Sequence, residues 1–120
     1  MLTVTISDQL GNQMFAYASV KTIAQNRGEF FGFVRAENNL INDTDKQYGN
    51  EIHTIFPNTK AEFLTELPTA ITHTWEEPPL RERTANYQPS ALTVPENTLM
   101  KGHFISCQYF WENRSQVQKW

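Results

Sequence analysis

Four residues near the amino terminus have side chains or backbone freedom suited to ligand chemistry: Asp8, Gly11, Asn12 and Gln13. A glycine lets the backbone approach a ligand closely, and the two amides can donate hydrogen bonds to sugar hydroxyls or phosphate oxygens. The Asp8 carboxylate can act as a general base that removes a proton from a hydroxyl. Each of the other three also has an ordinary interpretation, Gly11 as a turn glycine, Asn12 as a helix N-cap and Gln13 as a first-turn residue.

The segments on either side have the patterns of a strand and a helix. Leu2, Val4 and Ile6 alternate with polar residues, which is typical of a strand with one buried face. Residues 13–27 contain no Gly or Pro, which favours a helix, and Gly28 is placed to end it. The four candidate residues therefore belong to a loop between strand and helix, where α/β domains bind ligands. The amino terminus of the helix also favours an anion such as a diphosphate.

The rest of the chain is expected to complete a single α/β domain. Residues 29–34 are dense in aromatic side chains and predict a second strand, which a helical connection makes a parallel neighbour of the first. Prolines between residues 59 and 95 argue against long helices there. The further elements expected are a loop at 35–46, a short helix within 47–56, short strands and irregular connections at 59–95, a strand at 98–105 and a helix at 109–120.

Two segments carry a resemblance to a known family. Residues 10–18 read LGNQMFAYA. They resemble the amino-terminal signature of bacterial alpha-1,2-fucosyltransferases, glycosyltransferase family 11, which is Gly-Gly-Leu-Gly-Asn-Gln-Met/Leu-Phe-Gln-Tyr-Ala. Residues 101–110 read KGHFISCQYF and resemble the family's Gly-Tyr-Phe-Gln-Ser-Glu-Lys-Tyr-Phe segment. In this chain Asp8 and Gln9 stand where the family has its first two glycines.

The resemblance implies a transferase that moves fucose from GDP-fucose to the 2-hydroxyl of a terminal galactose on a glycan acceptor. Such enzymes invert the anomeric centre and need no metal or other cofactor. The implied architecture is GT-B-like, in which residues 1–120 form a Rossmann-like βαβ acceptor-side domain that lacks its carboxyl-terminal partner domain. Gly11, Asn12 and Gln13 carry over as substrate-binding residues. Asp8 is a candidate catalytic base that matches no residue of the family's pattern.

The family's basic donor-binding motif, His-x-Arg-Arg-Gly-Asp, has no equivalent in this sequence. Its arginine neutralises the leaving diphosphate, and without a metal this step needs a positive charge close by. The Asp8 carboxylate would also repel a diphosphate. One alternative is therefore a non-catalytic module or degenerate remnant that binds carbohydrate or nucleotide. Another is a dinucleotide-binding oxidoreductase domain, which a single Gly11 in place of G-x-G-x-x-G disfavours.

Composition excludes several other classes. A net charge of -3 with scattered basic residues disfavours nucleic acid as a partner. No apolar run approaches the ~18 residues of a membrane span, and no signal-peptide pattern precedes Leu2. We therefore expect a cytoplasmic protein, with peripheral association at the inner face of a membrane left open. The soft metal ligands have no zinc-like spacing, so no metal site is expected; they are His53, His73, His103 and Cys107.

Three further sets of residues are expected to have no direct role in chemistry. Several residues on the predicted helix should pack in the core, namely Met14, Phe15, Tyr17 and Ala18. Tryptophan can stack on a sugar ring, but packing is the favoured interpretation for Trp75, Trp111 and Trp120. The charged pairs and clusters of the proline-rich region should be solvated, namely Glu76, Glu77, Arg81, Glu82 and Arg83.

The missing donor-binding motif gives a first prediction. The isolated 120-residue chain should not transfer fucose from GDP-fucose, because the basic donor-binding motif that stabilises the leaving diphosphate is absent from it. Incubation with GDP-fucose and lactose, followed by mass spectrometry of the products, tests this, and unreacted lactose is the expected result. A fucosylated trisaccharide made by this chain alone contradicts the prediction.

Overall fold

The computed structural model of the chain describes residues 1–6, 10–35, 61–78 and 86–120. Some expectations lie outside this part of the chain, namely those for the helix within 47–56, Asp8, His53 and the charges at 81–83. The loop expected at 35–46 also lies outside it except for Arg35, which is the last residue of a strand. Within the described residues, no helix is both long and apolar enough to cross a membrane.

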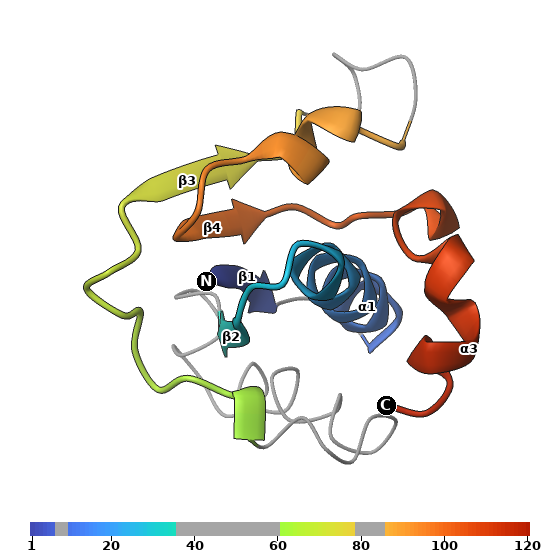
Figure 1. Ribbon diagram of the computed structural model, residues 1–120, viewed down its shortest axis with the longest axis horizontal. Helices are drawn as coiled ribbons and strands as arrows, with labels where there is room; N and C mark the ends of the chain where they lie inside the picture. The colour runs from blue at the N-terminus through green and yellow to red at the C-terminus, as the bar shows by residue number, and fades with distance from the viewer. Residues whose placement is uncertain (7–9, 36–60, 79–85) are drawn as a thin grey trace.

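The described residues contain four short strands, which are β1 (Leu2–Ile6), β2 (Phe31–Arg35), β3 (His73–Glu76) and β4 (Thr98–Lys101). They pair in one wholly parallel sheet with the spatial order β2-β1-β4-β3 (Figure 1). In the inner strand β1, Val4 lies opposite Phe33 of β2 on one side and Met100 of β4 on the other. The parallel pairing of β1 with β2 confirms the predicted βαβ unit and the α/β class.

Helix α1 (Leu10–Asn26) lies between β1 and β2 in the chain and packs against both strands (Figure 1). The expected start at Gln13 is wrong, because Leu10, Gly11 and Asn12 are already helical. A single glycine costs a helix about 1 kcal/mol relative to alanine, which packing against the sheet outweighs. Asn12 therefore lies inside the first turn rather than at the N-cap, and Gly11 supplies helical backbone rather than a turn.

The helix ends at Asn26, and Gly28 follows it as the left-handed residue that the sequence predicts. Gly28 has φ +69°, and its N–H donates to the Gln25 carbonyl at 3.1 Å. The N–H of Glu29 donates to the Ala24 carbonyl at 2.9 Å. These two bonds form a Schellman motif, which satisfies carbonyls of the last helical turn and directs the chain into β2. Strand β2 then begins at Phe31, close to the expected position.

The core lies between α1 and the sheet. The buried ring of Tyr17 packs edge-on against Phe31 and Phe33 of β2, with centroid separations of 5.4 and 5.8 Å. Met100 of β4 is fully buried in the same cluster. The helical residues expected to pack do so to different extents, with Tyr17 and Ala18 buried and Met14 and Phe15 half-buried.

The proline-rich region contains the short elements that were expected. Strand β3 is its one strand within the described residues, and the 3-10 turn η4 (Pro89–Thr93) begins at a proline. The expected strand at 98–105 is shorter than predicted, because β4 ends at Lys101 and Phe104 has a left-handed backbone with φ +54°. A left-handed residue does not continue an extended strand.

The prediction of a helix at 109–120 is wrong. Three short turns take its place, η5 (Cys107–Tyr109), η6 (Trp111–Asn113) and α3 (Arg114–Val117), which lie beside α1 at the right of Figure 1. Phe110 separates the first two turns with φ -133°, outside the helical region. Most side chains of η6 and α3 are exposed, so little apolar packing supports a continuous helix here.

The end of α1 gives a stability prediction. Gly28→Ala should lower the free energy of unfolding by about 1 kcal/mol, because a side chain strains the backbone at φ +69°. Space does not limit the change, since no described heavy atom lies within 4 Å of the added Cβ. Gly28→Asn is the matched control and should lose less, because asparagine tolerates a left-handed backbone. Urea unfolding measures both variants, and equal losses contradict the explanation.

Candidate functional site

The two segments that carry the family resemblance lie side by side in the structure. Residues 10–18 begin α1 after β1, and residues 101–110 begin at the last residue of β4, the neighbour of β1 in the sheet. The turn η5 contacts α1, and the rings of Phe15 and Phe110 lie 6.0 Å apart between centroids. Both segments thus meet at the carboxyl edge of the sheet, where α/β domains bind ligands.

The predicted substrate-binding residues occupy one helical turn but differ in access. The Asn12 side chain is partly exposed, whereas the Gln13 side chain is fully buried. Gly11 lies in the same turn, and Asp8 is outside the described residues. The first N–H groups of a helix have no partner inside it and carry the positive end of the dipole, which suits an anionic oxygen. Asn12 and these N–H groups are therefore the parts of the turn suited to a ligand.

Glu77 follows β3 at the same edge of the sheet, and the expectation that it is a solvated charge is wrong. The residue is buried, its N–H donates to the Lys101 carbonyl at 2.8 Å, and its carboxylate accepts from the His103 N–H at 3.2 Å. A Cβ at Gly102 would lie only 2.6 Å from the Glu77 Cβ. The glycine of the second resembling segment therefore has a packing role, since it admits the Glu77 side chain.

A polar cluster that the sequence analysis missed joins α1 to a distant turn. The Lys21 ammonium donates to the Tyr17 hydroxyl at 2.9 Å and pairs with the Glu62 carboxylate at 3.0 Å. The Tyr17 hydroxyl in turn donates to Glu62. Tyr17 and Lys21 are four residues apart on a helix, a spacing that predicts contact. Nothing in the sequence places Glu62 beside them.

The environment of Tyr17 decides what its hydroxyl can do. Burial, followed by the hydrogen bond and the negative charge of Glu62, raises the pKa of Tyr17 far above its ordinary value of 10.0. The hydroxyl therefore stays protonated at neutral pH and acts as a hydrogen-bond donor rather than as a base. The cluster of Tyr17, Lys21 and Glu62 is a structural link between elements.

The three tryptophans have different surroundings. Trp75 packs against Phe104 with 5.7 Å between centroids, and its indole N–H donates to the Ser90 hydroxyl at 3.2 Å. Trp120 is 7% exposed, and the Lys21 ammonium lies 4.4 Å from its ring centroid. Trp111 is 55% exposed. Packing is thus confirmed for Trp75 and Trp120, and the same expectation is wrong for Trp111.

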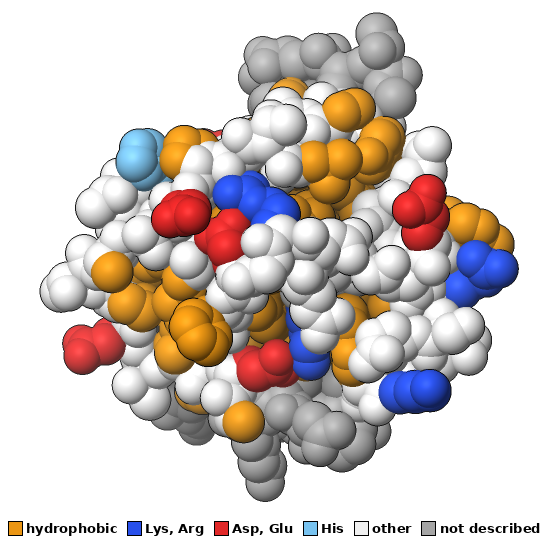
Figure 2. Space-filling model, viewed as in Figure 1, with side chains coloured by type: hydrophobic (Ala, Val, Ile, Leu, Met, Phe, Trp, Pro, Cys, Tyr) orange, Lys and Arg blue, Asp and Glu red, His pale blue; other side chains and the backbone are white. Residues whose placement is uncertain are grey.

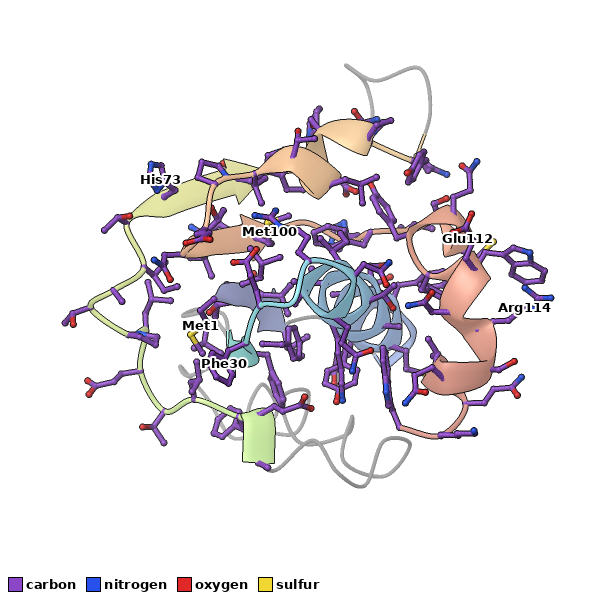
Figure 3. All side chains as sticks on the ribbon, viewed as in Figure 1. Met1, Phe30, His73, Met100, Glu112 and Arg114 are labelled. Atoms are coloured by element: carbon purple, nitrogen blue, oxygen red, sulfur yellow. The ribbon has the colours of Figure 1, made fainter. Side chains whose placement is uncertain are left out.

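Charges and metal ligands are dispersed in the described part of the molecule. No three His, Cys, Asp or Glu side chains of the described residues are arranged to hold a metal ion. His73 lies at the start of β3, far from Glu112 in Figure 3. Figure 2 shows acidic and basic side chains interspersed among uncharged ones on the face it presents.

Comparison of the chain with protein-family models, with curated proteins and with solved structures finds no match. The α/β class with an all-parallel sheet is established by the structure itself. Any assignment of function therefore depends on the residues of the two resembling segments and on the place where they meet.

The Tyr17 cluster gives a pH-dependent prediction. The unfolded tyrosine ionises near its ordinary pKa of 10.0, whereas the folded one keeps its proton. Above that pH the native state holds more protons than the unfolded state, so the free energy of unfolding falls by up to about 1.4 kcal/mol per pH unit. Tyr17→Phe should be less stable than wild type at pH 8, because Lys21 and Glu62 each lose a hydrogen bond. It should also lack the part of the decline in stability that comes from ionisation of Tyr17.

Urea unfolding at pH 8 and above pH 10 measures the effect. The stability gap between wild type and Tyr17→Phe should narrow at the higher pH. Tyr87→Phe is the matched control, because it removes a tyrosine hydroxyl elsewhere and leaves Tyr17 in place. A constant gap for Tyr17→Phe shows that its hydroxyl does not resist ionisation in the native state.

Proposed function

We propose that the chain is the amino-terminal, acceptor-side domain of a GDP-fucose-dependent galactoside alpha-1,2-fucosyltransferase with GT-B-type architecture. The observation that carries the proposal is the contact between residues 10–18 and residues 101–110 at the carboxyl edge of a parallel sheet. Each segment alone is a short match to the family. Their proximity in space is an independent reason to assign them to one site.

The proposed reaction uses the residues of this edge for the acceptor. The 2-hydroxyl oxygen of galactose attacks the anomeric carbon of fucose, the bond from that carbon to the diphosphate oxygen breaks, and GDP leaves. Asp8 is the candidate base that takes the hydroxyl proton. Asn12 hydrogen-bonds a hydroxyl of the acceptor, and the first-turn N–H groups offer positive potential to the departing phosphate oxygens.

The remaining positive charge must come from another domain. The family's Arg-Arg pair is absent from these 120 residues, so the proposal assigns donor binding to a carboxyl-terminal domain of the same protein. The reaction as proposed requires no metal and no cofactor other than the donor substrate.

The second candidate function is a non-catalytic module that binds the same glycan or nucleotide. Asp8 and Gln9 in place of two glycines favour it, because a carboxylate next to a diphosphate is repulsive. The intact mass of the protein from its native source separates the two functions. A mass more than twice 13.9 kDa supports a transferase with a donor domain, and a mass of 13.9 kDa supports the module.

Asn12→Ala tests the assignment of the first turn of α1. In a protein that includes the donor domain, kcat/KM for lactose should fall about tenfold, because one hydrogen bond to the acceptor is lost. The free energy of unfolding should change by less than ~0.5 kcal/mol, since the side chain is partly exposed. Gln25→Ala changes an exposed residue at the other end of the same helix and is the matched control with full activity.

Initial rates with GDP-fucose and lactose, together with urea unfolding of each variant, measure the two effects separately. Full activity of Asn12→Ala at unchanged stability removes this turn from the site. Loss of activity in the Gln25→Ala control as well shows a general effect of altering α1.

A further inference from the structure

A surface hollow of about 390 Å³ lies on the carboxyl-terminal turns. Its lining is Cys107 and Gln108 of η5 with Trp111 and Glu112 of η6. This volume is at the lower end of the range for ligand sites, so it suits a small ligand. The lining combines an aromatic ring with an amide and a carboxylate.

The Trp111 indole is largely exposed and carries the Arg114 guanidinium on one face. The guanidinium carbon of Arg114 lies 4.6 Å from the centroid of the ring, and Arg114 Nη1 donates to the Trp111 carbonyl at 3.0 Å. The guanidinium covers one face of the ring and is itself held against the Trp111 backbone, while 55% of the residue stays exposed. Figure 3 shows Arg114 and Glu112 at the outer edge of the molecule. A ring that already lies against the guanidinium has less freedom to lose when a ligand stacks on it.

The polar side chains of the hollow are placed to bind hydroxyl groups. Gln108 is positioned by Ser106, whose hydroxyl accepts from the Gln108 N–H at 3.2 Å and donates to its side-chain oxygen at 3.4 Å. The amide nitrogen of Gln108 is a donor, and the exposed carboxylate of Glu112 is an acceptor. A hydroxyl group both donates and accepts, so it can use the two side chains together.

We propose that this hollow binds a neutral hexopyranose ring. One face of such a ring is formed by C–H groups, which stack on an indole, and its rim carries hydroxyls that meet Gln108 and Glu112. A purely apolar ligand would leave the amide and the carboxylate without partners, and a phosphate would be repelled by Glu112. The choice of galactose as the sugar rests on the proposed function.

The place of the hollow fits a subsite for an extended acceptor. The turn η5 contacts α1, and Phe110, between η5 and η6, packs against Phe15 of α1. A glycan seated in the hollow therefore contacts η5, which follows β4 at the carboxyl edge of the sheet. The hollow then holds the acceptor through a sugar ring, while the first turn of α1 meets its reacting end.

Cys107 provides a site-specific readout, because it is the one cysteine of the chain, it is exposed and it lines the hollow. Iodoacetamide alkylates its thiol with loss of iodide, and intact-mass spectrometry gives the rate. Increasing methyl β-D-galactopyranoside should slow alkylation of the 120-residue chain severalfold and to a plateau. Each variant is compared with itself, with and without sugar, so a change in thiol reactivity does not enter the result.

Trp111→Ala removes the stacking surface and should weaken the sugar about tenfold, so that the protection disappears over the same concentration range. Gln116→Ala is the matched control, an exposed residue of α3 that does not line the hollow, and it should keep the protection. Circular dichroism melting confirms that both variants are folded. Alkylation unaffected by sugar in wild type, or protection that persists in Trp111→Ala, overturns the proposal.

Failure of the sugar site and failure of the proposed transferase function give different results. Methyl β-D-glucopyranoside is run in parallel, and protection by it with none by the galactoside contradicts the galactose assignment. Fucosyl transfer by the protein with its donor domain is measured separately. Transfer with no protection of Cys107 overturns the hollow as a sugar site and leaves the transferase assignment in place.

Discussion

The side chain of Tyr17 is the point at which distant parts of this chain meet. Its ring packs on two phenylalanines of β2 and lies 6.1 Å from the ring of Trp120, and its hydroxyl joins Lys21 and Glu62. Burying an aromatic ring supplies apolar area, but a buried hydroxyl must have partners, and the cluster provides them. The position of α1 on the sheet, and of the first turn that faces the carboxyl edge, therefore depends on a residue with no chemical role of its own.

The amino-terminal βαβ unit could be predicted from the sequence because its signals are local. Alternating residues in β1, a glycine at 28 and the aromatic run of β2 each act within a few residues. Strand β3 has no such signal, since its ends are set by pairing with β4 from His73 to Glu76. The helix expected at 109–120 does not form, although its local signal is present. Its sequence permits a helix, but too few of its side chains reach the core to hold one together.

In the candidate site, too, local features could be predicted from the sequence and tertiary contacts could not. Residues 10–18 were recognised from their types, yet the first three of them, residues 10–12, were predicted as a loop and are helical. The proximity of residues 101–110 depends on the strand order, which no local pattern encodes. The burial of Glu77 depends on the missing Cβ of Gly102, which directly follows the neighbouring strand β4. Candidate site residues can thus be identified from the sequence by their type, whereas the residues that surround them in space are determined by tertiary packing.

The strand order also has a consequence for how the molecule forms. Strand β1 pairs on one side with β2, the next strand in the sequence, and on the other side with β4. The second pairing closes a loop that includes most of the chain, which costs conformational entropy. Such non-local pairing slows folding. During synthesis β1, α1 and β2 are available first, and one side of β1 keeps unpaired N–H and C=O groups until β4 arrives. An inner strand of the finished sheet is thus, for a time, an edge open to pairing with another chain.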